Sequence, residues 1–187
     1  MARNTDRLDM SVAFQPVNIA VMTVSDTRTP EDDRSGDLLA ARIEEDGHML
    51  AARLIMTDDV DRIVSQLQDW IADAGIDVVI TTGGTGLTGR DSTPEAFASV
   101  VEKDIPGFGE LFRYLSFAKI GTSTVQSRAL AGVAGGTYMF ALPGSPSGCR
   151  DGWDDILRYQ LDIRHRPCNF VEIMPRLTES ATTRRSG

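Results

Sequence analysis

Acidic and small residues gather in the stretch TTGGTGLTGRDSTPEAF, from Thr81 to Phe97. The residues that could cradle a phosphate through unobstructed backbone N–H groups are Gly83, Gly84, Thr85 and Gly86. Asp91 would repel that phosphate unless a cation lay between them, and Mg²⁺ is commonly held by one or two carboxylates together with substrate phosphates. The stretch therefore indicates a phosphate site with a magnesium carboxylate at its rim. The alternatives are a tight strand-to-helix turn for the glycines and helix-dipole stabilisation for Asp91.

The same stretch contains a literal G-x-G-x-x-G at Gly84, Gly86 and Gly89. A dinucleotide-binding fingerprint belongs to the first βα unit, opens its helix inside the glycine pattern and has an acid at the end of the next strand. Here the loop follows the third expected strand, and Thr93 before Pro94 predicts a helix N-cap only after Gly89. A Ser92–Glu95 capping box is the alternative start. A nicotinamide-dependent reductase is therefore disfavoured.

Further acids are expected at the same edge of the sheet. Asp26 closes the first strand, and Asp58 and Asp59 follow the second. Residues beyond the carboxyl ends of parallel strands converge on one crevice. Asp59 suits the N-cap of the following helix, which leaves Asp58 as the candidate ligand beside Asp91. Arg90 is either a phosphate clamp or a solvent-facing charge.

A second loop of small residues, LPGSPSG at 142–148, also joins a strand to a helix. Ser145 before Pro146 predicts another capped helix N-terminus, and Gly144 and Ser145 are expected to line the ligand site. Two such termini with acids between them suit a ligand that carries more than one phosphate. The residues alone indicate a Mg²⁺-assisted nucleotide or phosphate-ester site.

The elements that must position these loops alternate along the chain. Strands are expected at 17–26, 48–56, 77–82 and 135–144, and helices at 34–47, 60–71, 94–102, 107–120 and 147–166. Val60, Ile63, Val64, Leu67 and Ile71 form one apolar helical stripe. The order predicts a three-layer α/β/α fold with a mostly parallel central sheet. Residues 1–15 and 176–187 are expected to be flexible ends of a single domain at 16–175.

Composition limits the classes of function. The formal charge of −8 leaves no broad basic face for nucleic acid. No apolar run is long enough for a membrane helix, and no signal-peptide core is present, so a cytoplasmic location is expected. Cys149 and Cys168 form no CxxC pattern, and His48 and His165 stand apart from each other, which gives little support to a zinc site.

The chain contains three long motifs: TTGGTGLTGRDSTPEA (81–96), LPGSPSGCRDGW (142–153) and QLDIRHRPCNF (160–170). Together they resemble the MoaB/Mog family of molybdenum cofactor biosynthesis. The last of these, with FGELFRYLSFAKIGTSTVQSRALAG (108–132), resembles the MoaB branch. The similarity runs from about Val17 to Phe170, which is nearly the whole expected domain.

The resemblance implies adenylylation of molybdopterin by ATP with Mg²⁺ and release of pyrophosphate. It implies that Asp91 and Asp58 are the acids on which activity depends, that Gly83 to Gly86 hold phosphate, and that Ser145 lines the pocket. Asp26 is a weaker assignment. A non-catalytic molybdopterin-binding relative is the alternative. The resemblance also implies a homotrimer or homohexamer. The RYLSF helix and the RPCNF segment are candidate contacts, because they carry aromatic and apolar side chains beyond what the sheet needs, and ordinary core packing is the alternative.

Overall fold

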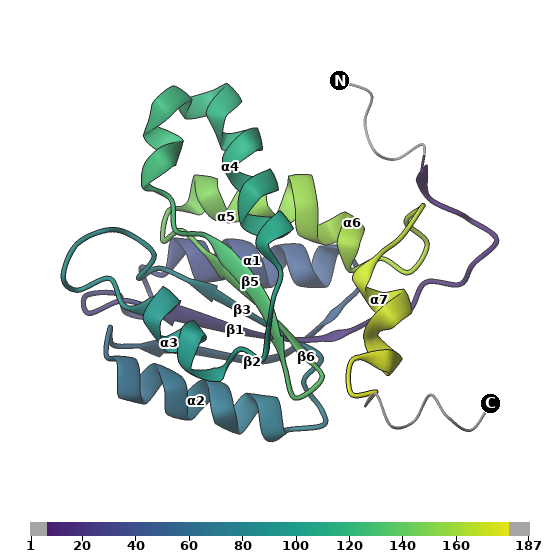
Figure 1. Cartoon of the computed structure of the whole chain (residues 1–187), viewed down its shortest axis with the longest axis horizontal. Coiled ribbons are helices and arrows are strands. Elements are labelled where there is room, and N and C mark those ends of the chain that lie inside the picture. The colour runs from purple at the N-terminus through teal and green to yellow at the C-terminus, as the bar shows by residue number, and fades with distance from the viewer. Residues whose placement is uncertain (1–6, 180–187) are drawn as a thin grey trace.

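The computed structural model describes residues 7–179, and within them a six-stranded sheet lies between two layers of helices (Figure 1). The strand order is β2-β1-β3-β6-β5-β4. The pairs β1–β2, β1–β3 and β3–β6 are parallel, whereas β5 pairs antiparallel with both β6 and β4. The predicted three-layer α/β/α architecture is confirmed. The parallel strands are those that carry the expected site, and the antiparallel strands form one edge.

The strands differ in burial according to their place in the sheet. Their bounds are β1 (Asn18–Val24), β2 (Met49–Met56), β3 (Val78–Thr82), β4 (Lys103–Asp104), β5 (Leu130–Ala134) and β6 (Thr137–Leu142). The central strands β3 and β6 are buried along their whole length. This pattern is typical of strands covered on both faces, and it explains why their sequences are apolar runs rather than alternating.

Helices cover both faces of the sheet. One face packs against α1 (Arg34–Glu45), α4 (Pro106–Ile120), α5 (Pro146–Gly152) and the π-helical turn η3 (Trp153–Leu157) that continues into α6 (Arg158–Gln160). The opposite face packs against α2 (Val60–Ala72) and α3 (Thr93–Val100). The remaining short helices are η2 (Gly121–Gln126), α7 (Phe170–Ile173) and η4 (Met174–Arg176).

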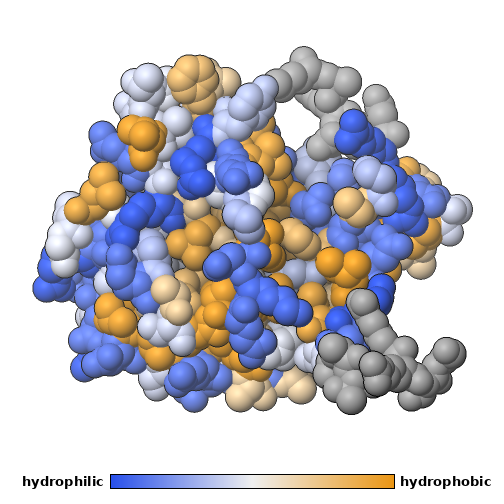
Figure 2. All heavy atoms as spheres, in the orientation of Figure 1, coloured by the Kyte–Doolittle hydropathy of each residue, from blue (hydrophilic) through white to orange (hydrophobic). Residues whose placement is uncertain are grey.

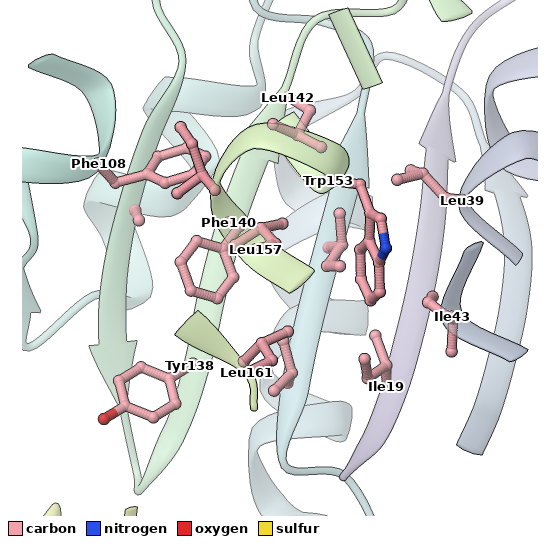
Figure 3. Packing of buried hydrophobic residues seen from close by; sticks show 14 of the residues in the cluster. Ile19, Leu39, Ile43, Phe108, Tyr138, Phe140, Leu142, Trp153, Leu157 and Leu161 are labelled. Carbon is pink, nitrogen blue, oxygen red and sulfur yellow. The ribbon is translucent and has the colours of Figure 1, made fainter. Parts of the chain in front are cut away.

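Trp153 lies in the core on the first face, among side chains from α1, β1 and β6 (Figure 3). It is completely buried, and its indole Nε1 donates a 2.7 Å hydrogen bond to Asp46. The polar atom of the ring is therefore satisfied while the ring fills the space between α1 and the sheet. This packing fixes the end of α5, which Trp153 directly follows, against α1 and the sheet.

Two predicted elements are shorter in the structure, and two strands were not predicted. The expected strand at 135–144 begins at Thr137, because Gly135 and Gly136 adopt φ angles of 57° and 93° and form a turn. That turn joins β6 to β5, a strand that was not predicted, and β4 was also missed at the end of the expected helix 94–102. The helix expected at 147–166 ends at Gln160 and contains the π-helical turn.

The N-terminal segment is held in place over the part that the structure describes. Leu8 forms an isolated antiparallel bridge with His165, and the Asp9 backbone N–H donates to Arg164 O at 2.8 Å. Of the arm predicted to be flexible at 1–15, residues 7–9 make these contacts and residues 1–6 lie outside the described residues; the flexibility itself stays a prediction. Of the tail predicted at 176–187, residues 180–187 also lie outside them. Within residues 7–179, no helix is long and apolar enough to cross a membrane.

Candidate active site

A cavity of about 710 Å³ opens at the carboxyl ends of β1, β3 and β6. Nine of the ten residues expected from the sequence line it: Asp26, Asp58, Gly83, Gly84, Thr85, Gly86, Asp91, Gly144 and Ser145. Helix α4 contributes the wall opposite the glycine loop, through Phe112, Ser116 and Lys119. The parallel strands thus bring together residues far apart in the sequence, as the topology predicts.

The glycine loop passes very close to neighbouring backbone. Gly83 and Gly84 adopt φ angles of 99° and 63°, which favour glycine. A Cβ at Gly83 would lie 2.2 Å from the carbonyl oxygen of Val24, so no side chain fits there. A Cβ at Gly144 would lie 3.1 Å from the Cα of Gly83. The two small-residue loops are therefore in contact and form one continuous cavity wall.

Thr93 connects the glycine loop to α3. Its backbone N–H donates to Gly84 O at 3.0 Å, and its hydroxyl donates to Gly83 O at 2.8 Å. The prediction that Thr93 caps α3 is wrong, because Thr93 is the first helical residue and Ser92 occupies the N-cap position. Ser92 makes no side-chain cap bond, so the alternative capping box is not formed either. The Thr93 hydroxyl instead fixes the loop on the helix.

Asp91 is held by Thr88 within the same loop. Its Oδ2 accepts hydrogen bonds from the Thr88 backbone N–H at 2.8 Å and from the Thr88 hydroxyl at 2.6 Å. These bonds hold the pKa of the Asp91 carboxyl below its usual value, and the hydrogen bond from the Thr88 hydroxyl has the largest effect. Asp91 is therefore ionised at neutral pH and faces the cavity as a carboxylate.

Asp58 and Asp59 are separated by their contacts. The Asp59 carboxylate accepts from the Arg62 backbone N–H at 3.0 Å and caps α2, as predicted. Asp58 lines the cavity and accepts from the Ser92 backbone N–H at 3.1 Å. A Cβ at Gly84 would lie 3.1 Å from the Asp58 Oδ2, which places this carboxylate against the glycine loop.

Arg90 is the expected residue that does not line the cavity. Its guanidinium forms an ion pair with Asp26, and its side chain is 72% exposed. The Asp26 carboxylate also accepts from the Asp58 backbone N–H at 3.2 Å. Asp26 therefore contacts both the Arg90 guanidinium and the turn that carries Asp58. Arg90 is linked to the cavity through this ion pair with Asp26.

The second loop has the capping geometry that its sequence predicts. Ser145 is the N-cap of α5, and its hydroxyl accepts from the Gly148 backbone N–H at 3.1 Å. Pro146 follows at the first helical position.

Cys149 lies behind this loop. Burial raises the pKa of its thiol to about 12, and the thiol lies 3.0 Å from the Thr82 hydroxyl. Cys149 is thus a structural thiol of the loop.

The cationic residues of the site were missed. Lys119 lines the cavity from α4, and its Nζ lies 2.6 Å from Asp151 Oδ1 and 3.2 Å from Asp155 Oδ2. Arg128 donates to two carbonyls of the glycine loop. Both residues lie in the stretch 108–132, but no local pattern there marks them as site residues, because their roles depend on contacts between distant segments. The hydropathy pattern could not have shown them.

Within residues 7–179, no group of three carboxylate, imidazole or thiol side chains is arranged to hold a metal ion. Four carboxylates line the cavity, those of Asp26, Asp58, Asp91 and Asp151. Carboxylate oxygens suit a hard cation such as Mg²⁺, which needs only one or two of them when substrate phosphates supply the rest.

Comparisons with known proteins indicate the family of this chain. The family described as "Probable molybdopterin binding domain" matches residues 20–163. The chain is 48% identical over 161 residues to Molybdenum cofactor biosynthesis protein B of Escherichia coli (strain K12), covering 86% of this chain and 95% of that protein. It is 43% identical to the protein of the same name from Staphylococcus carnosus, covering 78% and 87%.

Solved structures give the same result. A crystal structure of Molybdenum cofactor biosynthesis protein B superimposes with a TM-score of 0.78 at 39% identity, over 80% of this chain and 94% of that one. The tungsten cofactor synthesizing protein MoaB from Pyrococcus furiosus gives a TM-score of 0.72 at 32% identity, over 89% and 100%. The chain therefore belongs to the molybdopterin-binding family of molybdenum cofactor biosynthesis proteins.

Proposed function

We propose that the chain, as a member of this family, adenylylates molybdopterin with ATP and Mg²⁺. Its role in molybdenum cofactor biosynthesis follows from the family, and the proposal adds the reaction. The observation that carries the proposal is the single cavity in which two contacting small-residue loops face the carboxylates of Asp58 and Asp91. A site of this composition suits two phosphate-bearing reactants held side by side.

The reaction is a displacement at phosphorus. An oxygen of the terminal phosphate of molybdopterin attacks the α-phosphorus of ATP and forms a new P–O bond. The bond between the α-phosphorus and the bridging oxygen breaks, and its electron pair leaves with pyrophosphate. No nucleophilic side chain is required, so the chain contributes positioning and electrostatic stabilisation.

The residues around the cavity fit a magnesium ion. Asp58 and Asp91 would hold it, because both carboxylates line the cavity and the lowered pKa of Asp91 keeps that group charged. When bound, Mg²⁺ would offset charge on the transferring group and on the leaving pyrophosphate. In this proposal the substrate phosphates complete the coordination, since two carboxylates with phosphates are a common arrangement for Mg²⁺.

The loops position the reactants in this proposal. Backbone N–H groups of Gly83 to Gly86 bind one phosphate group, and the fixed contacts of Thr93 keep the loop from collapsing. Ser145 lies on the adjacent loop wall. Lys119 lines the cavity from α4, where its ammonium group is paired with Asp151 and Asp155. Holding both reactants in line removes much of the entropic cost of the reaction.

The test is incubation of the protein with molybdopterin, ATP and Mg²⁺, followed by chromatography for the adenylylated pterin and an assay for pyrophosphate. Wild type is expected to form both products, and Asp91→Ala to form neither at a comparable rate. Asp104→Ala on β4 is a matched control, since Asp104 is exposed and does not line the cavity. A wild type that forms no adenylylated pterin would contradict the enzymatic proposal.

The second candidate is a non-catalytic molybdopterin-binding protein. The observation that favours it is that Asp58 and Asp91 already accept hydrogen bonds from Ser92 and Thr88. These carboxylates therefore stabilise the loops whether or not a cation binds. Retention of molybdopterin on the protein, with no release of pyrophosphate from ATP, would select this candidate.

We also propose that the chain forms a homotrimer or homohexamer through α4. Leu111, Tyr114, Phe117 and Ile120 are spaced three residues apart on this helix, and each is at least 43% exposed. Figure 2 shows hydrophobic patches at the upper left, where α4 projects from the body. By contrast, Phe170 of the RPCNF segment packs against Tyr138 and Phe140 inside the molecule. A cytoplasmic location remains part of the proposal.

A further inference from the structure

Arg128 lies between η2 and β5, within the stretch 108–132 that resembles the MoaB branch, and no role was predicted for it. Its Nε donates to Gly86 O at 2.7 Å, and its Nη2 donates to Asp91 O at 2.9 Å. Its remaining terminal nitrogen pairs with Glu95 on α3. One guanidinium thus holds the backbone at both ends of segment 86–91, which ends with the candidate catalytic carboxylate.

Segment 86–91 has few other anchors. Residues 87–90 are exposed, Leu87 to 68%, and a Cβ at Gly89 would meet no atom within 4 Å. The segment's own bonds join Thr88 to Asp91, and these hold its shape but not its place on the body. The Arg90–Asp26 pair lies on an exposed side chain, where ion pairs contribute little. Arg128 comes from a different part of the chain, and its side chain is only 27% exposed.

We infer that Arg128 is a positioning residue, which aims the Asp91 carboxylate into the cavity by fixing the two carbonyls that bracket segment 86–91. This inference rests on the proposed function, because it assigns the carboxylate a cation to meet. The planar fork of arginine can bond two separate carbonyls from different nitrogens, whereas lysine offers a single point of charge. The positive charge of Arg128 also helps to lower the pKa of Asp91.

The consequence concerns the cation site more than the fold. With Arg128 replaced by glutamine, the Thr88–Asp91 turn persists but is no longer fixed relative to Gly83 and Gly84. Loss of an outer partner of a metal ligand typically lowers metal affinity or activity about 10- to 100-fold. We therefore expect cation affinity and turnover to fall by such a factor while the global unfolding transition is retained.

The experiment compares wild type with Arg128→Gln, Arg128→Lys and Glu95→Gln. Glu95→Gln is the matched control, because it removes the exposed ion-pair partner of Arg128 and leaves both carbonyl contacts in place. The first readout is amide hydrogen exchange of peptides that cover 86–91. The second is binding of Mn²⁺, a probe for the magnesium site, followed by electron paramagnetic resonance in the presence of ATP.

Arg128→Gln is expected to accelerate exchange in 86–91 and to weaken Mn²⁺ binding about 10- to 100-fold, while Glu95→Gln changes neither. Arg128→Lys keeps the charge but should restore neither the slow hydrogen exchange in 86–91 nor the wild-type Mn²⁺ affinity. If Arg128→Gln fails to fold, the comparison is made with Arg128→Lys alone. Wild-type Mn²⁺ affinity in Arg128→Gln or Arg128→Lys would overturn the inference. A wild type that binds Mn²⁺ in an Arg128-dependent manner without turnover would contradict adenylyl transfer and leave this inference standing.

Discussion

The Asp58 carboxylate accepts hydrogen bonds from both the backbone N–H and the hydroxyl of Ser92, the N-cap residue of α3. The next residue, Asp59, accepts from the Arg62 backbone N–H and caps α2. Two adjacent acids therefore form hydrogen bonds at the N-termini of two different helices, Asp58 at α3 and Asp59 at α2. Only Asp58 also lines the cavity, because it lies on the side of the turn that faces the glycine loop.

Because only Asp58 lines the cavity, substitutions at the two acids should affect different properties: turnover for Asp58 and stability for Asp59. Asp58→Asn keeps an acceptor for Ser92 but removes the charge, so turnover should fall about 100-fold or more, the scale of one lost electrostatic contact in a transition state. Asp59→Ala should cost about 1 kcal/mol of unfolding free energy through loss of the α2 cap, with turnover retained. Urea denaturation and the pyrophosphate assay measure the two effects. Equal turnover in Asp58→Asn and wild type would show that the charge of Asp58 has no role in the reaction.

The two thiols should differ in reactivity. Burial raises the pKa of Cys149 to about 12, and Cys149 is buried beside Thr82, whereas Cys168 is exposed. Because the thiolate is the reactive form, Ellman's reagent at pH 8 should titrate one thiol rapidly in the folded protein and both in guanidinium chloride. Cys168→Ser should abolish the rapid phase. A rapid phase that survives this change would mean that Cys149 is accessible.

Stability should decrease on mild acidification because of His48. Burial lowers the pKa of His48 below its usual value of 6.5, although the negative charges of Asp46 and Asp162 oppose the shift. Its Nδ1 accepts from the Val17 backbone N–H at 3.3 Å, a bond that protonation would forfeit. The unfolded chain therefore takes up the proton first, and the stabilisation present above pH 6.5 is lost as the pH falls from there through the folded pKa.

The measurement is urea denaturation at several values between pH 7.5 and pH 5. Wild type should lose unfolding free energy across this interval, and His48→Gln should show a flatter dependence. The same slope in both proteins would assign the acid sensitivity to other groups. The folded baseline, recorded by circular dichroism at each pH, separates this titration from a change of structure.

Assembly should depend on the exposed face of α4. Tyr114 is 67% and Phe117 is 57% exposed, and a charge at either position would oppose burial against a second copy. Tyr114→Glu and Phe117→Glu should lower the mass measured by light scattering at micromolar concentration. Met49→Glu is the control, because Met49 is 58% exposed on the edge strand β2, away from α4. A wild-type protein that is monomeric would contradict the proposal directly.

The sequence predicted best the features that depend on local chemistry. The apolar stripe of α2, the Asp59 cap and the Ser145–Pro146 start of α5 follow from short-range rules, and each is confirmed. The site residues also came together, because parallel strands deliver their carboxyl ends to one edge. Nine of the ten expected residues line the cavity for this reason.

Features set by contacts between distant segments were not predictable. β5 is a short run of small residues, LAGVA, which has little strand signal until β6 pairs with it. Thr93 reads as a cap, yet its hydroxyl is taken by the Gly83 carbonyl across the loop. Arg128 was given no role from the sequence, and only the fold brings it to the carbonyls of Gly86 and Asp91. In each case the partner, rather than the residue type, determines the role.

The glycine loop divides into a closed half and an open half. At Gly83 the Val24 carbonyl leaves no room for any side chain, whereas Gly89 faces open space at a backbone conformation that other residues can adopt. The open half is therefore a suitable place for a spectroscopic reporter. A fluorophore on Gly89→Cys, in a chain that also carries Cys168→Ser, would lie near Asp91 in the sequence and outside the phosphate-binding residues proposed at Gly83 to Gly86. Its emission would follow ligand arrival in real time, independently of whether the ligand is then transformed.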